Sequence, residues 1–211
     1  MDVKRSVSST YLPGNKPKTD NLLNSIVEKL LEKVAFNQKG GDHLIFVGDL
    51  INKGPDSTGV VDLARQYSAS SVRGNHEDRI LLIRREMVKT KALNGSDDAE
   101  ASYYSSRELN ERALARSLSD EQVQWLENFP VILNVGQVPN MGQVVVVHAG
   151  LVPDIELEKQ DPSSVMTMRT IDLDTHVPSP KKKGMNWAKV RSSLYLLSRS
   201  ALSVLTLPSD V

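Results

Sequence analysis

Three short apolar segments of this chain each end in polar side chains that can bind a metal ion. The segments read LIFVGD, SSVRGNH and VVVVH, and the polar side chains at their ends are Asp49, Asn75, His76 and His148. In open α/β sheets, binding sites form where strands end at one edge of the sheet, so three such ends can meet in one place. Carboxylate, amide and imidazole groups together suit hard or borderline divalent cations. The sequence therefore predicts an α/β fold that carries its functional residues at strand ends.

A βαβ unit is predicted around the first two segments. Residues 43–47 read as a buried strand, Pro55 opens a helix, and the chain returns as a strand at residues 70–72. A strand, a helix and a strand within about 30 residues imply a parallel pair of strands. This pairing would bring Asp49 and Asn75 to neighbouring strand ends.

The rest of the chain divides into further predicted elements. Apolar spacing and capping residues predict helices at residues 22–34, 77–88 and 120–129, strands at 131–135 and 143–147, and mostly loop at 161–183. By domain, we expect a flexible N-terminal arm at residues 1–19, one folded domain at 20–190, and a Ser/Leu-rich tail at 191–211.

The composition excludes several kinds of protein. The 211 residues suffice for one domain, and 26 basic residues balance 26 acidic ones, so we expect no DNA binding. The absence of cysteine removes disulfides, zinc–thiolate sites and thiol nucleophiles. No stretch approaches the ~20 apolar residues of a membrane span, and the first residues lack the apolar core of a signal peptide. We therefore expect a soluble, cytoplasmic protein.

Two common nucleotide-binding folds lack their sequence signatures here. A strand ending in an acidic residue such as Asp49 also occurs in nucleotide hydrolases, but these need a phosphate loop of the form GxxxxGK followed by Ser or Thr. A Rossmann-type binder needs a glycine fingerprint after its first strand. The chain contains neither pattern.

The three polar segments resemble motifs of a known family. GDLINKGPDS, RGNHED and HAGLVP are similar to the second, third and fourth motifs of the calcineurin-like metallophosphoesterases, in the phosphoprotein-phosphatase superfamily. The resemblance is closer to the ApaH-like branch, whose second motif carries Lys and Gly-Pro where protein phosphatases carry Asp-Arg-Gly. The run LEKQDPSSVMTMRT also looks like that branch. The resemblance covers about residues 30–187 and implies a four-layer αββα sandwich with mixed sheets, incomplete at both ends.

The resemblance implies a dinuclear metal site. Two divalent ions, of Mn, Fe, Zn or Co, would share Asp49 as a bridging ligand. The amide oxygen of Asn75 and the ring of His148 would bind the second ion. These three residues are the metal ligands that the sequence predicts.

The resemblance also implies residues that act on the substrate. His76 would donate a proton to the leaving oxygen. Lys53 would bind the phosphate as a point charge, and Arg169 is a candidate for a second phosphate contact. The implied function is metal-dependent hydrolysis of phosphoesters or phosphoanhydrides. The substrate would be a phosphorylated small molecule such as a dinucleoside polyphosphate, a polyphosphate, or a phosphoprotein.

Two further motifs of the family are missing from the sequence. Neither the first motif, Gly-Asp-x-His-Gly, nor the last, Gly-His-Asp, can be found, and no histidine follows His176. One metal ion would then keep only Asp49 as a ligand. A second hypothesis therefore stays open: a non-catalytic remnant of the fold, from a truncated or mis-spliced chain, with weak metal or phosphate binding.

Overall fold

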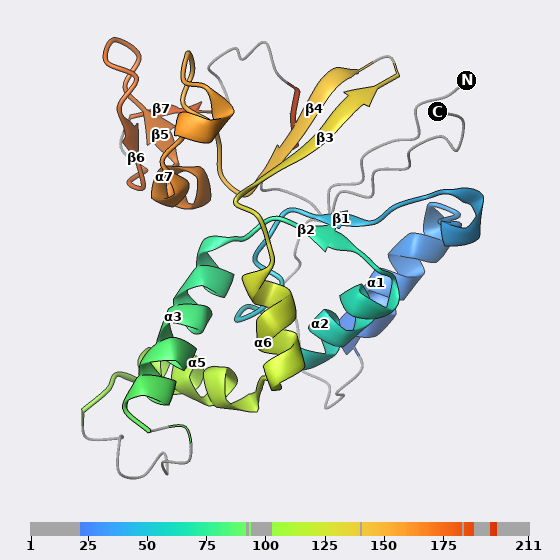
Figure 1. The fold of residues 1–211 in the computed structure, drawn as a ribbon, viewed down its shortest axis with the longest axis vertical. Helices are drawn as coiled ribbons and strands as arrows, with labels where there is room; N and C mark the ends of the chain where they lie inside the picture. Colours follow the sequence, from blue (N-terminus) through green and yellow to red (C-terminus); the bar gives the residue numbers. More distant parts are fainter. Residues whose placement is uncertain are drawn as a thin grey trace.

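The computed structural model of the protein describes residues 22–91, 93, 103–139, 141–182, 184–187 and 195–197. Helices and short strands are mixed along the chain, which is the α/β class that the sequence predicts (Figure 1). The helices are α1 (Leu22–Lys33), α2 (Ser57–Gln66), α3 (Asn75–Lys89), α5 (Ser106–Ser117), α6 (Asp120–Glu127) and α7 (Pro162–Thr167). The strands are β1 (Ile45–Phe46), β2 (Ser70–Ser71), β3 (Ile132–Val138), β4 (Gly142–Val147), β5 (Thr170–Ile171), β6 (Pro178–Ser179), β7 (Met185–Asn186) and β8 (Tyr195–Leu197).

The first strand separates two layers of the fold. Leu44, which precedes β1, and Phe46 of β1 are buried among side chains of α1, α2, α3 and α6. Ile45 and Val47 pack instead against Val146 of β4. Successive side chains of a strand point to opposite faces, so the alternation assigns one face to the helices and the other to a second sheet. In Figure 1 the β3–β4 hairpin accordingly lies on the opposite side of β1 and β2 from the helices α1, α2, α3, α5 and α6.

The second sheet carries the fourth layer on its far face. Val145 and Val147 of β4 pack with Leu151 and with Val165 of α7, on the side away from β1. β3 runs antiparallel to β4, and β8 runs parallel to it, so this sheet is mixed. The order of layers is helices, β1–β2, β3–β4–β8 and α7, which confirms the predicted αββα arrangement.

The predicted βαβ unit is present. β1 and β2 are parallel, with Ile45 opposite Ser70 and Phe46 opposite Ser71. The helix between them starts where Asp56 accepts a hydrogen bond from the backbone N–H of Gly59 over 2.8 Å. The cap of α2 and the parallel pairing of β1 with β2 therefore both match the predicted βαβ unit. Together they bring the ends of the two strands close to each other.

The start of α3 differs from the prediction. The helix begins at Asn75, two residues before the predicted start, so Asn75 and His76 lie in its first turn. The reason is a capping arrangement in which the carboxylate of Glu77 accepts the backbone N–H of Gly74 over 2.9 Å.

Two other segments differ from the sequence prediction. Residues 161–183, predicted to be mostly loop, contain α7, β5 and β6. Asp161 begins α7 by accepting the backbone N–H of Ser164 over 2.7 Å, and Pro162 fits the first helical position. The helix α5 was not predicted, although Ser105 and Glu108 form a capping box at its start.

The ends of the chain are described only in part. The predicted arm at residues 1–19 lies outside the described residues. In the predicted tail, β8 pairs with β4 over three residue pairs. None of the helices that the structure describes has the length and apolar character that a membrane span requires.

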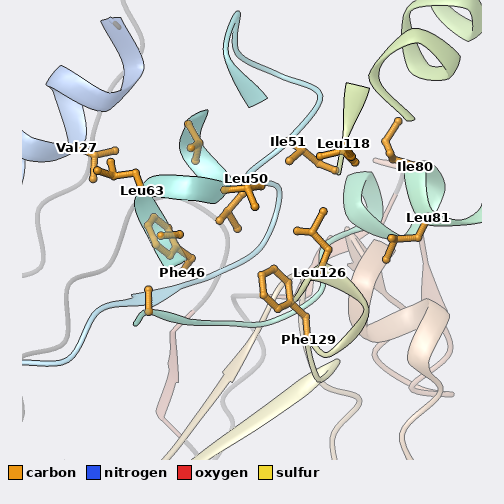
Figure 2. Close-up of a cluster of buried hydrophobic side chains, with 14 of the residues drawn as sticks. Val27, Phe46, Leu50, Ile51, Leu63, Ile80, Leu81, Leu118, Leu126 and Phe129 are labelled. Atoms are coloured by element: carbon orange, nitrogen blue, oxygen red, sulfur yellow. The ribbon is translucent and has the colours of Figure 1, made fainter. Parts of the chain in front are cut away.

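The helical layer and β1 share one apolar core. Figure 2 shows side chains from α1, α2, α3 and α6 converging on Phe46, Leu50 and Ile51. Ile80 and Leu126 are fully buried there. Because Leu50 and Ile51 directly follow Asp49, this core fixes the loop that carries the first predicted ligand.

Two neighbouring leucines of α3 test this core. Leu81 is 1% exposed and Leu82 is 55% exposed, so the same truncation removes buried contacts in one case and exposed ones in the other. Leu81→Ala is expected to lower the free energy of unfolding by about 2–5 kcal/mol. Leu82→Ala is expected to change it by less than about 0.5 kcal/mol. Urea unfolding measures both, and equal losses would contradict the packing described.

Candidate active site

The predicted strand ends meet around the side chain of Asp49. The Nε2 atom of His148 lies 3.2 Å from Oδ1 of Asp49, and the backbone N–H of His76 donates to the same oxygen over 3.3 Å. Lys53 forms an ion pair with Oδ2. The structure therefore brings four of the six residues predicted for the site into direct contact, and Asn75 directly precedes His76 in the chain.

Two glycines permit this close approach. Gly48 has a φ of +81°, and a Cβ atom there would lie 2.8 Å from both the backbone N of Gly74 and Nδ1 of His148. At Gly74, a Cβ atom would lie 2.6 Å from the backbone N of Asp49. Real Cβ atoms do not tolerate such contacts, and a positive φ favours glycine. Glycine is thus required where β1 and β2 end.

Glu77 fixes the backbone at the junction where β1 and β2 end. Its buried carboxylate accepts backbone N–H groups of Asp49 over 2.8 Å, Gly74 over 2.9 Å and Ile51 over 3.2 Å. Burial and the charge of Asp49 raise the pKa of Glu77, while the three backbone hydrogen bonds oppose that shift. Glu77 therefore both caps α3 and holds the loop that carries Asp49.

The ring of His148 presents an electron pair to Asp49. Nδ1 lies 2.7 Å from the carbonyl oxygen of Val47, which can only accept, so Nδ1 donates its hydrogen there. Nε2 is buried and makes no hydrogen bond to any residue that the structure describes. Two electron-pair donors, Nε2 and Oδ1 of Asp49, thus face each other at 3.2 Å. A cation between them would relieve the repulsion, so the pair fits a metal ion.

Asp49 is held in its ionised form. Burial by itself would raise the pKa of Asp49, but the contacts of its carboxylate with the His148 ring and with the Lys53 ammonium outweigh burial and hold the pKa well below its usual range. A buried, ionised carboxylate at this position is suited to bind a cation.

His76 is held by a contact that the sequence did not predict. Its Nδ1 lies 3.1 Å from Nδ2 of Asn52, and the same Asn52 nitrogen lies 3.5 Å from Oε1 of Glu111. Burial lowers the pKa of His76, Asp49 opposes this, and the nearby positive charges add to the lowering. Asn52 stands inside the second motif, so its place in the site could have been read from sequence; Glu111, 59 residues away, gave no such signal.

Arg169 shows no contact with the Asp49 cluster in the part of the chain that the structure describes. It is exposed, and its backbone N–H donates to the carbonyl of Ser179 over 2.8 Å. Its side chain makes no hydrogen bond or ion pair with the residues that the structure describes. Its phosphate contact stays a prediction.

A pocket of about 580 Å³ opens beside Asn75. Residues of α3, α5 and α7 supply most of its lining, which consists of Asn75, Asp78, Arg79, Leu82, Ile83, Glu86, Tyr104, Arg107, Glu108, Arg112, Ser163, Met166 and Thr167. Of the residues predicted for the site, this lining includes Asn75, which directly precedes His76 in the chain.

The metal ligands predicted from the sequence are fewer than two metal ions need. Asp49, Asn75 and His148 offer a carboxylate, an amide and an imidazole. Within the described ranges, no cluster of three or more His, Asp or Glu side chains could hold a metal ion. Asp49 is the anionic member of this predicted set.

The family model of the calcineurin-like phosphoesterases matches residues 13–202. This chain belongs to the calcineurin-like phosphoesterase family. The resemblance predicted from the three motifs is confirmed. Enzymes of this family are metal-dependent, generally with two metal ions.

Named relatives support the same membership. The symmetrical bis(5'-nucleosyl)-tetraphosphatase of Shewanella sp. strain W3-18-1 is 28% identical over 153 residues, which cover 72% of this chain and 49% of that protein. Its counterpart in Nitrosospira multiformis is 32% identical over 136 residues, 62% of this chain and 41% of that protein. Serine/threonine-protein phosphatase 1 of Salmonella typhimurium is 42% identical over 74 residues, 35% of this chain and 34% of that protein. The chain spans about half the length, or less, of these curated relatives.

A solved structure supports the fold as well. The crystal structure of a presumed diadenosine tetraphosphatase superposes with a TM-score of 0.64 at 30% identity. The match covers 82% of this chain and 67% of that chain. The family fold is therefore established for most of the sequence.

Glu77 and Glu86 of α3 test how the site is held. Glu77→Gln replaces a carboxylate oxygen with an amide N–H₂ that faces backbone donors, so at least one buried N–H loses its acceptor. The expected loss is about 1–3 kcal/mol of unfolding free energy. Glu86→Gln, at an exposed position of the same helix, is expected to cost less than about 1 kcal/mol. Urea unfolding compares the two, and a neutral Glu77→Gln would mean that Glu77 does not hold the junction.

Proposed function

We propose that this chain hydrolyses phosphoesters or phosphoanhydrides with the help of divalent metal ions. The observation that carries the proposal is the buried Nε2 of His148, without a hydrogen bond to the described residues, 3.2 Å from an ionised oxygen of Asp49. In this family, the same strand ends are expected to carry the catalytic residues. We assign the catalytic domain to residues 20–190.

The proposed metal ligands are Asp49, Asn75 through its amide oxygen, and His148. Carboxylate, amide and imidazole donors accept manganese, iron, zinc or cobalt, so availability decides which ion binds. When bound, such an ion polarises a phosphoryl oxygen and lowers the pKa of the attacking water. The hydrogen bond from His148 to Val47 fixes the ring so that Nε2 remains available to the ion.

Lys53 is proposed to bind the phosphate that is cleaved. Its ammonium group is half exposed and contacts Asp49 at the centre of the site. A flexible stem lets the ammonium turn from the carboxylate to an incoming phosphoryl oxygen. Arg169 is the second candidate for phosphate binding.

His76 is proposed to donate a proton to the leaving oxygen. Asn52 holds its Nδ1, which leaves Nε2 for the substrate. The protein alone lowers the pKa of His76, but an anionic phosphate beside the ring favours the charged, proton-donating form. Substrate binding would therefore create the acid that the reaction needs.

The relatives suggest which substrates to test. Several are named as symmetrical bis(5'-nucleosyl)-tetraphosphatases, and we propose a dinucleoside polyphosphate as the substrate of this chain. A phosphoprotein is the second candidate, because the Salmonella relative named as a serine/threonine-protein phosphatase is 42% identical over 74 residues.

A non-catalytic remnant of the fold is the alternative to an active enzyme. The relatives are named as hydrolases, which favours the enzyme. The reason to keep the alternative under test is that no group of three or more His, Asp or Glu side chains in the described residues could hold a metal ion.

Hydrolysis of p-nitrophenyl phosphate and of a dinucleoside tetraphosphate with added Mn²⁺ tests the proposal. Wild type is expected to need the metal. His76→Ala is expected to lower kcat by about 10²–10⁴-fold, the usual contribution of a positioned proton donor. Asp49→Asn is expected to abolish metal-dependent turnover, because the anionic ligand is lost.

Asp62→Asn is the matched control for Asp49→Asn. Asp62 lies on the exposed surface of α2 and pairs with Arg65, so the same chemical change occurs away from the site. This variant is expected to retain wild-type turnover. Absence of turnover in wild type with Mn²⁺, Fe²⁺, Zn²⁺ and Co²⁺ would instead support the non-catalytic remnant.

A further inference from the structure

A buried carboxylate holds two arginines at the edge of the pocket. Glu111 of α5 is 1% exposed, and its two oxygens accept Nε–H groups from different helices. Arg79 of α3 donates to Oε2, and Arg107 of α5 donates to Oε1 over 2.9 Å. The two guanidinium groups oppose the effect of burial and lower the pKa of Glu111, so the carboxylate stays ionised.

The two arginines keep donors for another ligand. Each uses Nε to reach Glu111, and neither guanidinium makes a further hydrogen bond to the residues that the structure describes. Arginine carries five N–H donors in a planar fork, so the Nη groups of both remain for an acceptor. The group of two arginines and one carboxylate therefore has a formal excess of one positive charge.

The acidic residues of the pocket are already engaged. Asp78 pairs with Arg73 over 3.7 Å, and Glu86 pairs with Arg112 over 3.5 Å. Glu108 accepts the backbone N–H and the hydroxyl of Ser105. The Nη–H groups of Arg79 and Arg107 are thus the charged donors of this lining that remain available to an anion.

The arginines lie close to the proposed catalytic residues. Arg79 and Arg107 line the same pocket as Asn75, one of the proposed metal ligands. Oε1 of Glu111 lies 3.5 Å from Nδ2 of Asn52, which in turn contacts the ring of His76. A substrate that reaches the metal ligands at one end can therefore extend towards the arginines.

We propose that Arg79 and Arg107, positioned by Glu111, bind a second phosphate group of the substrate, next to the phosphate that is cleaved. Two guanidinium forks can bind phosphate oxygens bidentately, which a single ammonium group cannot do. A simple helix-to-helix ion pair would explain the contact with Glu111, but it would leave the Nη donors of both arginines without a role. The inference rests on the proposed function only for the position of the cleaved phosphate.

Calorimetric titration with tripolyphosphate and with inorganic phosphate, in EDTA without metal, tests the site independently of hydrolysis. Wild type is expected to bind tripolyphosphate more tightly than phosphate. Arg79→Gln and Arg107→Gln are each expected to lower the affinity for tripolyphosphate about tenfold, through loss of charge-assisted hydrogen bonds. Arg107 is 70% exposed, so its substitution leaves the fold intact, which circular dichroism checks.

Arg85→Gln is the matched control on α3. Arg85 is exposed, pairs with Glu127 over 3.0 Å and does not line the pocket, so the variant removes the same charge elsewhere on the helix. It is expected to change the affinity by less than about twofold, since exposed charges are screened. Three results would overturn the inference: wild type binds no tripolyphosphate, neither pocket variant weakens it, or Arg85→Gln weakens it equally. Failure to hydrolyse any substrate would overturn the proposed function and leave this result standing.

Discussion

The rest of the site depends on the buried contact between Asp49 and His148. These side chains come from the ends of strands in two different sheets, and their facing atoms lie 3.2 Å apart. Backbone hydrogen bonds hold each partner: Val47 binds the ring of His148, and Glu77 binds the loop of Asp49. Because electron pairs face each other there, the protein keeps a local repulsion that a cation would turn into attraction. We interpret the surrounding structure as the scaffold that maintains this contact.

The stacking of the two sheets explains how distant segments reach it. Val146 of β4 packs against Ile45, Val47 and Val72, and His148 follows two residues later. Side chains of a strand alternate between faces, so a shift of one residue in β4 would turn His148 away from Val47 and expose buried valines. The hydrophobic pattern that builds the core therefore also sets the position of the proposed ligand. Gly48 and Gly74 remove the Cβ atoms that would keep the strand ends apart.

Local signals made much of this predictable. The parallel pair β1–β2, the helix capped by Asp56 and the β3–β4 hairpin follow from apolar periodicity and turn residues, and the three motifs located Asp49, His76 and His148. What the sequence did not predict depends on long-range contacts. Glu111 meets Asn52 and Arg79 across 59 and 32 positions, on a helix whose weak apolar pattern hid it. Ligands for a second metal ion are the part of the family's site that neither the sequence nor the described residues supply.

A crystal structure of the chain grown with Mn²⁺, with anomalous diffraction from the metal, tests the central claim most directly. The account predicts an anomalous peak bonded to Asp49 and to Nε2 of His148, with the Asn75 amide as third ligand. The metal–nitrogen distance would be about 2.0–2.2 Å, similar to other borderline divalent ions. A map without a peak there, in which Nε2 of His148 still faces Asp49 or donates a proton to it, would contradict the account. The contact would then be an ordinary buried ion pair that holds two sheets together.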